Sequence, residues 1–378
     1  MPPLKILHVL RAPVGGLFRH VTDLAREQIA RGHHVGMIVD SRTGNARADA
    51  LLGEMEPSLA LGLSRVAMRR QPGPEDVLSL SHVMRRMAAT EADVVHGHGA
   101  KGGAFARLAF NRREAARAYT PHGGSLLFSH DTLGGKIYLT TEKLLMPRGD
   151  LYLFESAFSA DTFRRKIGAP RTIARVVHNG VTPAEFAPLT FAADATDLLF
   201  MGEMRQLKGV DVLLEAIALL RRNGRAVSAT LVGDGQERDT FKAQASSLGL
   251  GSLVRFRPAM PARQAQTLGH VMVVPSRMES LPYVVLETAA AGKPLIATRV
   301  GGIAEIFGPL TPELVPADDA PALAAAILGI LDAPDTAAEK ARTLRERVAA
   351  LFSLKAMTDG VLAAYGEALE FLAKSGRR

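Results

Sequence analysis

The sequence predicts an α/β protein of two doubly wound domains that face each other across a cleft. Short apolar runs alternate with amphipathic helical segments along the chain, as they do when helices cover both faces of a parallel sheet. The same strand, loop and helix order starts again near residue 196. A length of 378 residues is sufficient for two domains of ordinary size.

The first half opens with an apolar strand at 4–10, followed by a glycine loop, a helical segment at 17–32 and a second strand at 33–40. A helical pattern follows at 104–116. Further strand-and-loop units are expected at 92–99, 116–124, 149–156 and 175–181.

The second half repeats this order with a strand at 196–202 and a helix at 209–224. Because its apolar runs are short and do not alternate with polar residues, we expect strands that are buried on both faces. The remaining elements are strands at 227–235, 253–259, 267–276 and 294–298, and a helix at 236–250.

The boundary between the domains is expected at 182–196, which has two prolines and little periodicity. We therefore assign 1–185 to the first domain and 186–355 to the second. Residues 356–378 form a helical tail that is expected to cross back to the first domain.

Composition restricts the chemistry and the partners. The chain has no cysteine, which excludes disulfides and cysteine-ligated metals and fits a reducing cytoplasm. Apolar runs are too short for a membrane span, and the first one is typical of a strand rather than a signal peptide. Residues 1–190 contain 25 Lys and Arg against 17 Asp and Glu, whereas the rest is balanced.

The basic first half suggests an anionic partner, either a nucleic acid or an anionic membrane surface, or only a solvated basic face. Few aromatic residues accompany the basic stretches. Because single-stranded nucleic acids bind by stacking on aromatic rings, we expect no nucleic-acid partner.

Three strand-end loops are candidates for binding phosphate. Arg205 and Lys208 precede a predicted helix, whose N-terminal N–H groups and positive dipole favour anions; ordinary solvated cations are the alternative. Gly15 and Gly16 follow the first strand and allow close backbone approach or simply a tight turn. The glycines at 301–302 form a third such pair.

Two glutamates stand eight residues apart, Glu279 before a predicted helix start at Pro282 and Glu287 inside that helix. Carboxylates bind vicinal hydroxyls through charge-assisted hydrogen bonds, so one could bind a ribose and the other a transferred sugar. Alternatively, both are ordinary helix residues. A further pair, His96 and His98, has a spacing that metals use, but no third ligand is evident, so we expect no metal.

The order of these motifs resembles that of the family-4 retaining glycosyltransferases, which have the GT-B fold of two Rossmann-like domains. The resemblance covers almost the whole chain, and the block around the two glutamates is its most specific part. Leu281-Pro282 replaces the Phe-Gly of many relatives. The matching segments are GGLFRHV, HGHGAKGG, TPHGG, HNGV, MGEMRQLKG, LVGDG, ESLP and VLETAAAGKP.

For the second domain, the resemblance implies that Arg205 and Lys208 hold the diphosphate of a nucleotide-sugar donor. Glu287 matches the residue that binds the ribose, and Glu279 matches the acid that contacts the hydroxyls of the transferred sugar.

The same resemblance places the backbone amides of Ser280 and Leu281 near the donor phosphates. In the first domain, Gly15 and Gly16 match a loop that closes on the diphosphate, and His122 matches a histidine near the donor sugar and the acceptor. The catalytic roles would fall to four residues: Glu279, His122, Arg205 and Lys208.

The implied activity is that of a retaining, metal-independent hexosyltransferase without a cofactor. It would move a sugar from a UDP- or GDP-sugar, bound by the second domain, to a glycan or polyprenyl-linked acceptor, bound by the first, in the synthesis of surface polysaccharide or another glycoconjugate. We expect it in the cytoplasm, at the inner face of the plasma membrane, where arginines at 65–70, 85–86 and 106–118 would contact anionic lipid.

Two other functions remain compatible with the residues: a nucleotide-sugar 2-epimerase on the same scaffold, and a non-catalytic protein that binds nucleotides or sugars. A nicotinamide dehydrogenase is disfavoured because the glycine pattern of dinucleotide-binding loops is missing.

Overall fold

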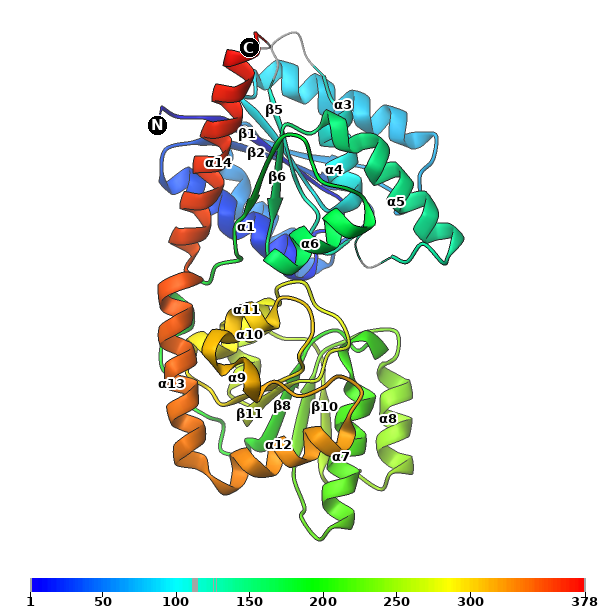
Figure 1. Cartoon of the computed structure of the whole chain (residues 1–378), viewed down its shortest axis with the longest axis vertical. Coiled ribbons are helices and arrows are strands. Elements are labelled where there is room, and N and C mark those ends of the chain that lie inside the picture. The colour runs from blue at the N-terminus through cyan, green and yellow to red at the C-terminus, as the bar shows by residue number, and fades with distance from the viewer. Residues whose placement is uncertain (1, 111–114, 125, 127, 377–378) are drawn as a thin grey trace. The chain divides into compact units, whose positions relative to one another are not determined.

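The chain folds into two compact units, one formed by residues 1–180 and 354–378 and the other by 181–353. The computed structural model describes residues 2–110, 115–124, 126 and 128–376. Each unit is a parallel sheet with helices on both faces, so the predicted α/β class with two doubly wound sheets is confirmed (Figure 1).

The first unit has a seven-stranded sheet in the order β3-β2-β1-β4-β5-β6-β7. Its strands are β1 (Lys5–Leu10), β2 (His34–Asp40), β3 (Leu63–Val66), β4 (Val94–His98), β5 (Ala116–Thr120), β6 (Leu151–Phe154) and β7 (Ile173–Val176). Its helices are α1 (Gly15–Ala30), α2 (Ala46–Met55), α3 (Glu75–Thr90), α4 (Gly99–Leu108), α5 (Leu133–Leu145), α6 (Ala157–Lys166) and α14 (Leu354–Lys374).

The C-terminal helix α14 covers one face of this first sheet (Figure 1). Its apolar residues recur every three or four positions, which places them on one side of the helix. They pack against Ile6, Val94 and Leu151 of the strands. The segment after residue 353 therefore completes the first core, although the second unit precedes it in the chain.

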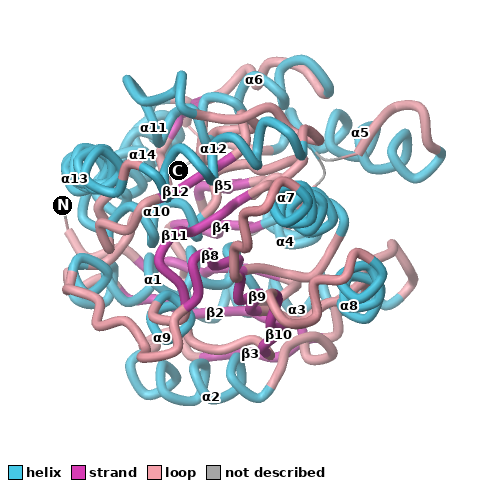
Figure 2. Tube along the Cα trace, turned by 90° about the horizontal axis from the view of Figure 1, so that it is seen from below, coloured by secondary structure: helices cyan, strands magenta, loops and turns pink. Residues whose placement is uncertain are grey.

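The second unit has a five-stranded sheet in the order β10-β9-β8-β11-β12. Figure 2 shows these strands in succession, with helices along both sides. The strands are β8 (Thr196–Met201), β9 (Ala229–Val232), β10 (Val254–Arg257), β11 (Gly269–Val274) and β12 (Leu295–Ala297). The helices are α7 (Val210–Arg222), α8 (Arg238–Ser247), α9 (Ala262–Gln266), α10 (Tyr283–Ala290), α11 (Ile303–Phe307), α12 (Ala320–Asp332) and α13 (Pro334–Leu351).

Residues of the second sheet alternate between two hydrophobic clusters. Leu198 and Val273 belong to the cluster that contains α7 and α12, whereas Leu199 and Met272 belong to the one that contains α10 and α13. Successive side chains of a strand point to opposite faces. Both faces are thus buried, which is why these strands appear as continuous apolar runs in the sequence.

The helix predicted at 104–116 is confirmed only at its start, and its arginines do not form one row on a helix. Helix α4 ends at Leu108, and β5 begins at Ala116. The Arg107 guanidinium is fully buried and lies 2.8 Å from the Glu142 carboxylate. Arg117 belongs to β5 and lies 3.0 Å from Asp150. Arg112 and Arg113 lie outside the described residues.

Within the described part of the chain, no single helix has the length and hydropathy needed to cross a membrane. Helices α12 and α13 have the required length and hydropathy only when counted together, and the chain bends by 102° between them.

Candidate active site

In the sheet of the second unit, the order in which the chain adds strands reverses between β8 and β11. From β8 the chain builds β9 and β10 on one side, and it then returns to build β11 and β12 on the other. The loops that leave the carboxyl ends of β8 and β11 therefore diverge, and ligands of open α/β sheets bind in the crevice between such loops. The loop after β8 contains Arg205 and Lys208, and the loop after β11 contains Glu279.

Lys208 and Glu279 form an ion pair at this point. The Lys208 ammonium donates to Glu279 Oε1 over 2.7 Å, and the Ser276 hydroxyl donates to the same oxygen over 2.7 Å. The side chain of Glu279 is 9% exposed and that of Lys208 is 26% exposed. These two residues, for which the sequence predicts separate ligand contacts, are thus direct partners in the structure.

Glycines allow the three loops to approach one another. Gly209, with a φ of +68°, lies so close to the end of β11 that a Cβ there would be 1.9 Å from the Pro275 carbonyl oxygen. After β9, a Cβ on Gly233 would lie 1.8 Å from the carbonyl oxygen of Gly202. No side chain fits at such distances, so glycine is required at both positions.

Arg277 fastens the loop after β11 to the loop after β8. Its guanidinium contacts both carboxylate oxygens of Asp211, at 2.8 and 2.6 Å, and one of Asp318 at 2.5 Å. It also donates to the Gln206 carbonyl. The hydrogen bonds to Asp211 raise the pKa of Arg277. Sequence reasoning missed this residue, although a basic residue between two strand-end motifs was visible.

The glycine pair at 301–302 contacts the backbone of Glu279 and Ser280. Gly301 has a φ of +57°, and a Cβ there would lie 1.8 Å from the Glu279 carbonyl oxygen. The N–H of Gly302 donates to the Ser280 carbonyl over 2.7 Å. The structure shows this loop in contact with the backbone that carries the glutamate, and phosphate binding by its glycines stays a prediction.

The remaining predicted residues of the second unit belong to the same two loops and to α10. Arg205 is about half exposed, and its guanidinium lies 3.6 Å from the Glu203 carboxylate. Ser280 and Leu281 precede α10, and Leu281 is buried. Glu287 lies inside α10 and is 7% exposed. A carboxylate so deep in an apolar helix indicates a specific polar function or partner.

In the sheet of the first unit, the strand order reverses between β1 and β4. Gly15 and Gly16 follow β1 at this point. Gly15 begins α1 with a φ of +66°, and a Cβ there would meet no atom within 4 Å. The backbone conformation, rather than lack of space, therefore favours glycine at this position.

His122 belongs to a cluster of five histidines in the first unit. His8 and His98, on the adjacent strands β1 and β4, are joined by an Nδ1–Nε2 distance of 2.9 Å, and His98 Nδ1 lies 3.0 Å from His122 Nε2. His96 and His20 pack their rings against this chain. Sequence reasoning missed His8 and His20, although parallel register places His8 beside His96.

Two triads of this cluster have ligand nitrogens within 4.8 Å of one another: His8, His96 and His98, and His20, His98 and His122. Metal ligation would have to replace the existing hydrogen bonds, since both nitrogens of His98 already face other imidazoles. The arrangement fits a hydrogen-bonded network better than a metal site.

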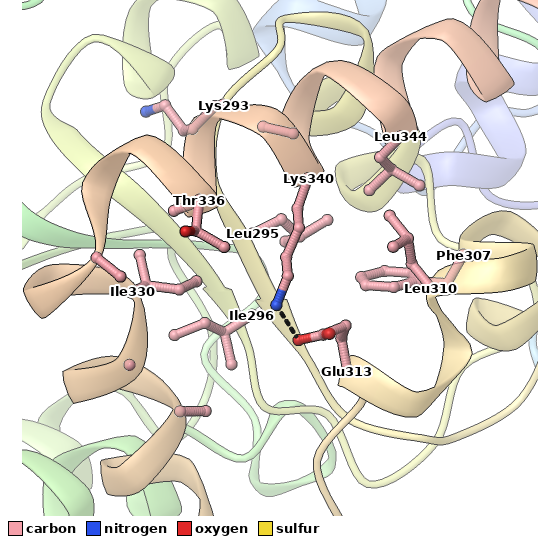
Figure 3. Close-up of a pocket in the computed structure, with 15 residues that line it drawn as sticks. Lys293, Leu295, Ile296, Phe307, Leu310, Glu313, Ile330, Thr336, Lys340 and Leu344 are labelled. Carbon is pink, nitrogen blue, oxygen red and sulfur yellow. Dashed lines mark hydrogen bonds and ion pairs between the residues drawn. The ribbon is translucent and has the colours of Figure 1, made fainter.

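A cavity of about 190 Å³ lies elsewhere in the second unit, among β12, α11, α12 and α13. Figure 3 shows its mostly apolar wall and the ion pair of 2.7 Å between Lys340 and Glu313. Its wall includes Leu295, the first residue of β12. The cavity therefore lies by the amino end of this strand, whereas Lys208 and Glu279 follow the carboxyl ends of β8 and β11.

The contact behind Glu279 predicts that Gly301→Ala lowers the free energy of unfolding by more than about 2 kcal/mol, because it adds a left-handed strain and a collision with backbone. Gly251→Ala is the control, since a Cβ there meets nothing within 4 Å. Urea unfolding measures both variants. Equal midpoints for Gly301→Ala and the unaltered protein would show that the loop does not hold this contact.

The histidine cluster predicts a loss of stability in mild acid. Burial lowers the pKa of both His8 and His20 from 6.5 to about 4. The folded state then binds fewer protons than the unfolded state, so stability is unaffected above pH 6.5 and falls as the pH drops towards 4. The cost is about 2 kcal/mol for each of the two by pH 5.

Urea unfolding at pH 7.5 and pH 5 measures this dependence before most carboxylates titrate. The variant His130→Asn, at an exposed histidine, should keep the pH dependence of the unaltered protein. Equal unfolding free energies at the two pH values would contradict the prediction.

Comparison with known proteins identifies the two halves. Residues 14–185 match the family described as Glycosyltransferase Family 4, and residues 195–333 match Glycosyl transferases group 1. A D-inositol 3-phosphate glycosyltransferase from Thermobispora bispora is 30% identical over 322 residues, which cover 77% of this chain and 75% of that protein. A glycogen synthase from Mycobacterium tuberculosis is 27% identical over 401 residues, 97% of this chain and 93% of that protein.

Among solved structures, Anabaena Alr3699/HepE in complex with UDP and glucose has a TM-score of 0.80 at 19% identity, and the match covers 96% of this chain and all of that one. This structural similarity supports the fold, whereas the sequence similarity to the relatives above shows the family. The chain therefore is a glycosyltransferase of the GT-B fold and belongs to glycosyltransferase family 4.

Proposed function

We propose that this glycosyltransferase moves a hexosyl group from a UDP- or GDP-sugar to a hydroxyl of a glycan or lipid-linked acceptor, with retention of the anomeric configuration and without a metal or cofactor. The observation that carries the proposal is the Lys208–Glu279 ion pair at the point where the strand order of the second sheet reverses. UDP and glucose in the HepE structure support a donor of this kind.

The donor diphosphate would bind to Arg205 and Lys208. When the bond between the anomeric carbon and the diphosphate breaks, negative charge develops on the leaving oxygen, and fixed cations lower the barrier for this step. Lys208 is already positioned by Glu279 at 2.7 Å, and Arg205 is exposed enough to reach a ligand.

Glu279 and Glu287 would bind the two hydroxyl-rich parts of the donor. Oε1 of Glu279 already accepts from Lys208 and Ser276, which leaves Oε2 to accept from a hydroxyl of the transferred sugar. Glu287 would accept from the ribose, with the amides of Ser280 and Leu281 directed to the phosphates.

For retention, the acceptor hydroxyl would attack from the face that the diphosphate leaves. The new bond joins the anomeric carbon to the acceptor oxygen, and the proton of the hydroxyl passes to an oxygen of the leaving diphosphate. No side-chain base is assigned. Gly15, Gly16 and His122 of the first unit would contribute substrate contacts.

The test is a transfer assay with a panel of UDP- and GDP-sugars and hydroxyl acceptors. We expect one donor class to be consumed, EDTA to leave the rate unchanged, and NMR of the product to show the anomeric configuration of the donor. An inverted product would overturn the retaining mechanism, and a strict need for added divalent metal would overturn the role of the cations.

Removal of the cations should abolish most transfer. Arg205→Met combined with Lys208→Met should lower kcat/KM by about 100- to 1,000-fold, since charge stabilisation at the leaving group has this magnitude. Lys242→Met, which removes an exposed lysine of α8 in the same unit, is the matched control. Unchanged kcat/KM in the double variant would show that the diphosphate binds elsewhere.

We further propose that α5 contacts an anionic membrane and thereby brings the enzyme to a polyprenyl-linked acceptor at the inner face of the plasma membrane. Leu133, Ile137 and Leu144 are 78%, 51% and 71% exposed and lie along one side of the helix. Lys136 and Lys143 are exposed beside them. Exposed apolar residues flanked by lysines are typical of helices that lie in a membrane interface.

Cosedimentation with vesicles tests this contact. Protein should bind vesicles that contain phosphatidylglycerol, and changing Leu133, Ile137 and Leu144 to Ser should lower the bound fraction at least about tenfold. Leu351→Ser, at an exposed leucine of α13 in the second unit, is the control. Binding that persists in the triple variant would exclude α5 as the membrane contact.

A further inference from the structure

Three imidazoles and one carboxamide form a linear hydrogen-bonded chain inside the first unit. Gln28 Oε1 lies 2.9 Å from His8 Nε2, His8 Nδ1 lies 2.9 Å from His98 Nε2, and His98 Nδ1 lies 3.0 Å from His122 Nε2. Gln28 and His8 are fully buried, His98 is 1% exposed, and His122 is half-buried. The chain thus runs from the core of the unit towards solvent.

The imidazoles of this chain are neutral near pH 7. Burial lowers the pKa of His8 to about 4 and holds the pKa of His98 and His122 well below the ordinary value. Burial also lowers the pKa of the neighbouring His20 and His96, so protonated neighbours do not disturb the chain. A neutral imidazole has one N–H donor and one acceptor nitrogen.

The neutral imidazoles and the carbonyl oxygen of Gln28 together fix which atom donates in each of these hydrogen bonds. The carbonyl oxygen of Gln28 can only accept, so His8 must donate from Nε2 and accept at Nδ1. His98 must then donate from Nε2 to His8 and accept at Nδ1, and His122 must donate from Nε2 to His98. The only proton of neutral His122 is therefore on Nε2, and its Nδ1 has a lone pair.

We infer that Gln28, His8 and His98 are positioning residues that set the tautomer of His122 and make its Nδ1 an acceptor for a substrate hydroxyl. Among the described residues, His122 makes one side-chain hydrogen bond, the one to His98. Its backbone lies in the left-handed region, with a φ of +52°. The substrate part of this inference rests on the proposed function, whereas the tautomer does not.

The Nδ1 lone pair of His122 determines which ligand groups can bind at the half-buried end of this hydrogen-bonded series. A lone pair accepts from a hydroxyl but does not bind a group that only accepts, such as fluorine or a phosphate oxygen. His122 would therefore select a sugar hydroxyl, and the buried residues behind it would keep that preference independent of small changes in pH.

The experiment is a long-range 1H–15N correlation spectrum of the full chain with 15N-labelled histidine, which distinguishes the two neutral tautomers. His33 is an internal standard, because its Nδ1 accepts from the Leu4 N–H at 3.0 Å and its proton must be on Nε2. The spectrum of His122→Asn identifies the His122 signals. We expect His122 to show the same tautomer as His33.

Gln28→Leu removes the residue that gives the chain its direction. It should convert His122 to a mixture of both tautomers while His33 is unchanged. A proton on Nδ1 of His122 in the unaltered protein, or an unchanged His122 signal in Gln28→Leu, would overturn the inference. If Gln28→Leu does not fold, the spectrum of the unaltered protein still decides between the two tautomers.

A second pair of variants tests the link through His98. In His98→Asn a carboxamide oxygen can still accept from His122 Nε2, whereas His98→Leu offers no acceptor. Asn should therefore retain the His122 tautomer, and Leu should lose it. Equal behaviour of the two would show that His98 acts only by packing.

The transfer assay separates this inference from the proposed function. Gln28→Leu should lower kcat about five- to tenfold, the effect of one weakened neutral hydrogen bond, and His98→Asn should be more active than His98→Leu. The expected tautomer without any transfer would contradict the proposed function alone. Transfer with the opposite tautomer would contradict the inference alone.

Discussion

Lys208 and Glu279 are 71 residues apart in the chain, yet their ion pair connects the two loops of the proposed donor site. A largely buried carboxylate is costly unless it is paired and hydrogen-bonded, and here Lys208 and Ser276 supply both. Gly301 and Arg277 keep the backbone of the same loop in place. The Lys208 ammonium has three donors, so in the proposed mechanism it can contact a donor diphosphate while its hydrogen bond to Glu279 is kept.

The first unit uses neutral groups at the corresponding edge of its sheet. No carboxylate acts on the pKa of His8, His98 or His122. His8 and His98 bond to each other, to Gln28 and to His122, whereas His96 bonds to Tyr365 and Thr120 and His20 bonds to Asn179. Neutral hydrogen bonds cost less to bury than ions, and their direction can be transmitted over several residues. The two units thus differ in chemistry although they share one topology.

The excess of basic residues in the first half does not correspond one to one to charge at the surface. Arg107 is an internal partner of Glu142, Arg117 pairs with Asp150, and the lysines beside the exposed leucines of α5 were not part of the predicted patch. Composition reports how many charges a segment has, but only packing decides which of them face the solvent. Arg107 and Arg117 therefore do not form the expected basic surface, whereas Arg65, Arg69, Arg70 and Arg85 are exposed; the anionic partner stays a prediction.

The sequence by itself determined the α/β class, the repeated strand and helix order, the family, the loops that contain Arg205, Lys208 and Glu279, and the helix that contains Glu287, because these depend on local periodicity and on motifs within short segments. Only the tertiary structure decided that Lys208 pairs with Glu279, that Gly301 contacts the glutamate backbone, and that His8 and Gln28 join His98 and His122. The physical reason is that parallel pairing brings together strand ends that are distant in sequence, and no local pattern records which side chains then meet.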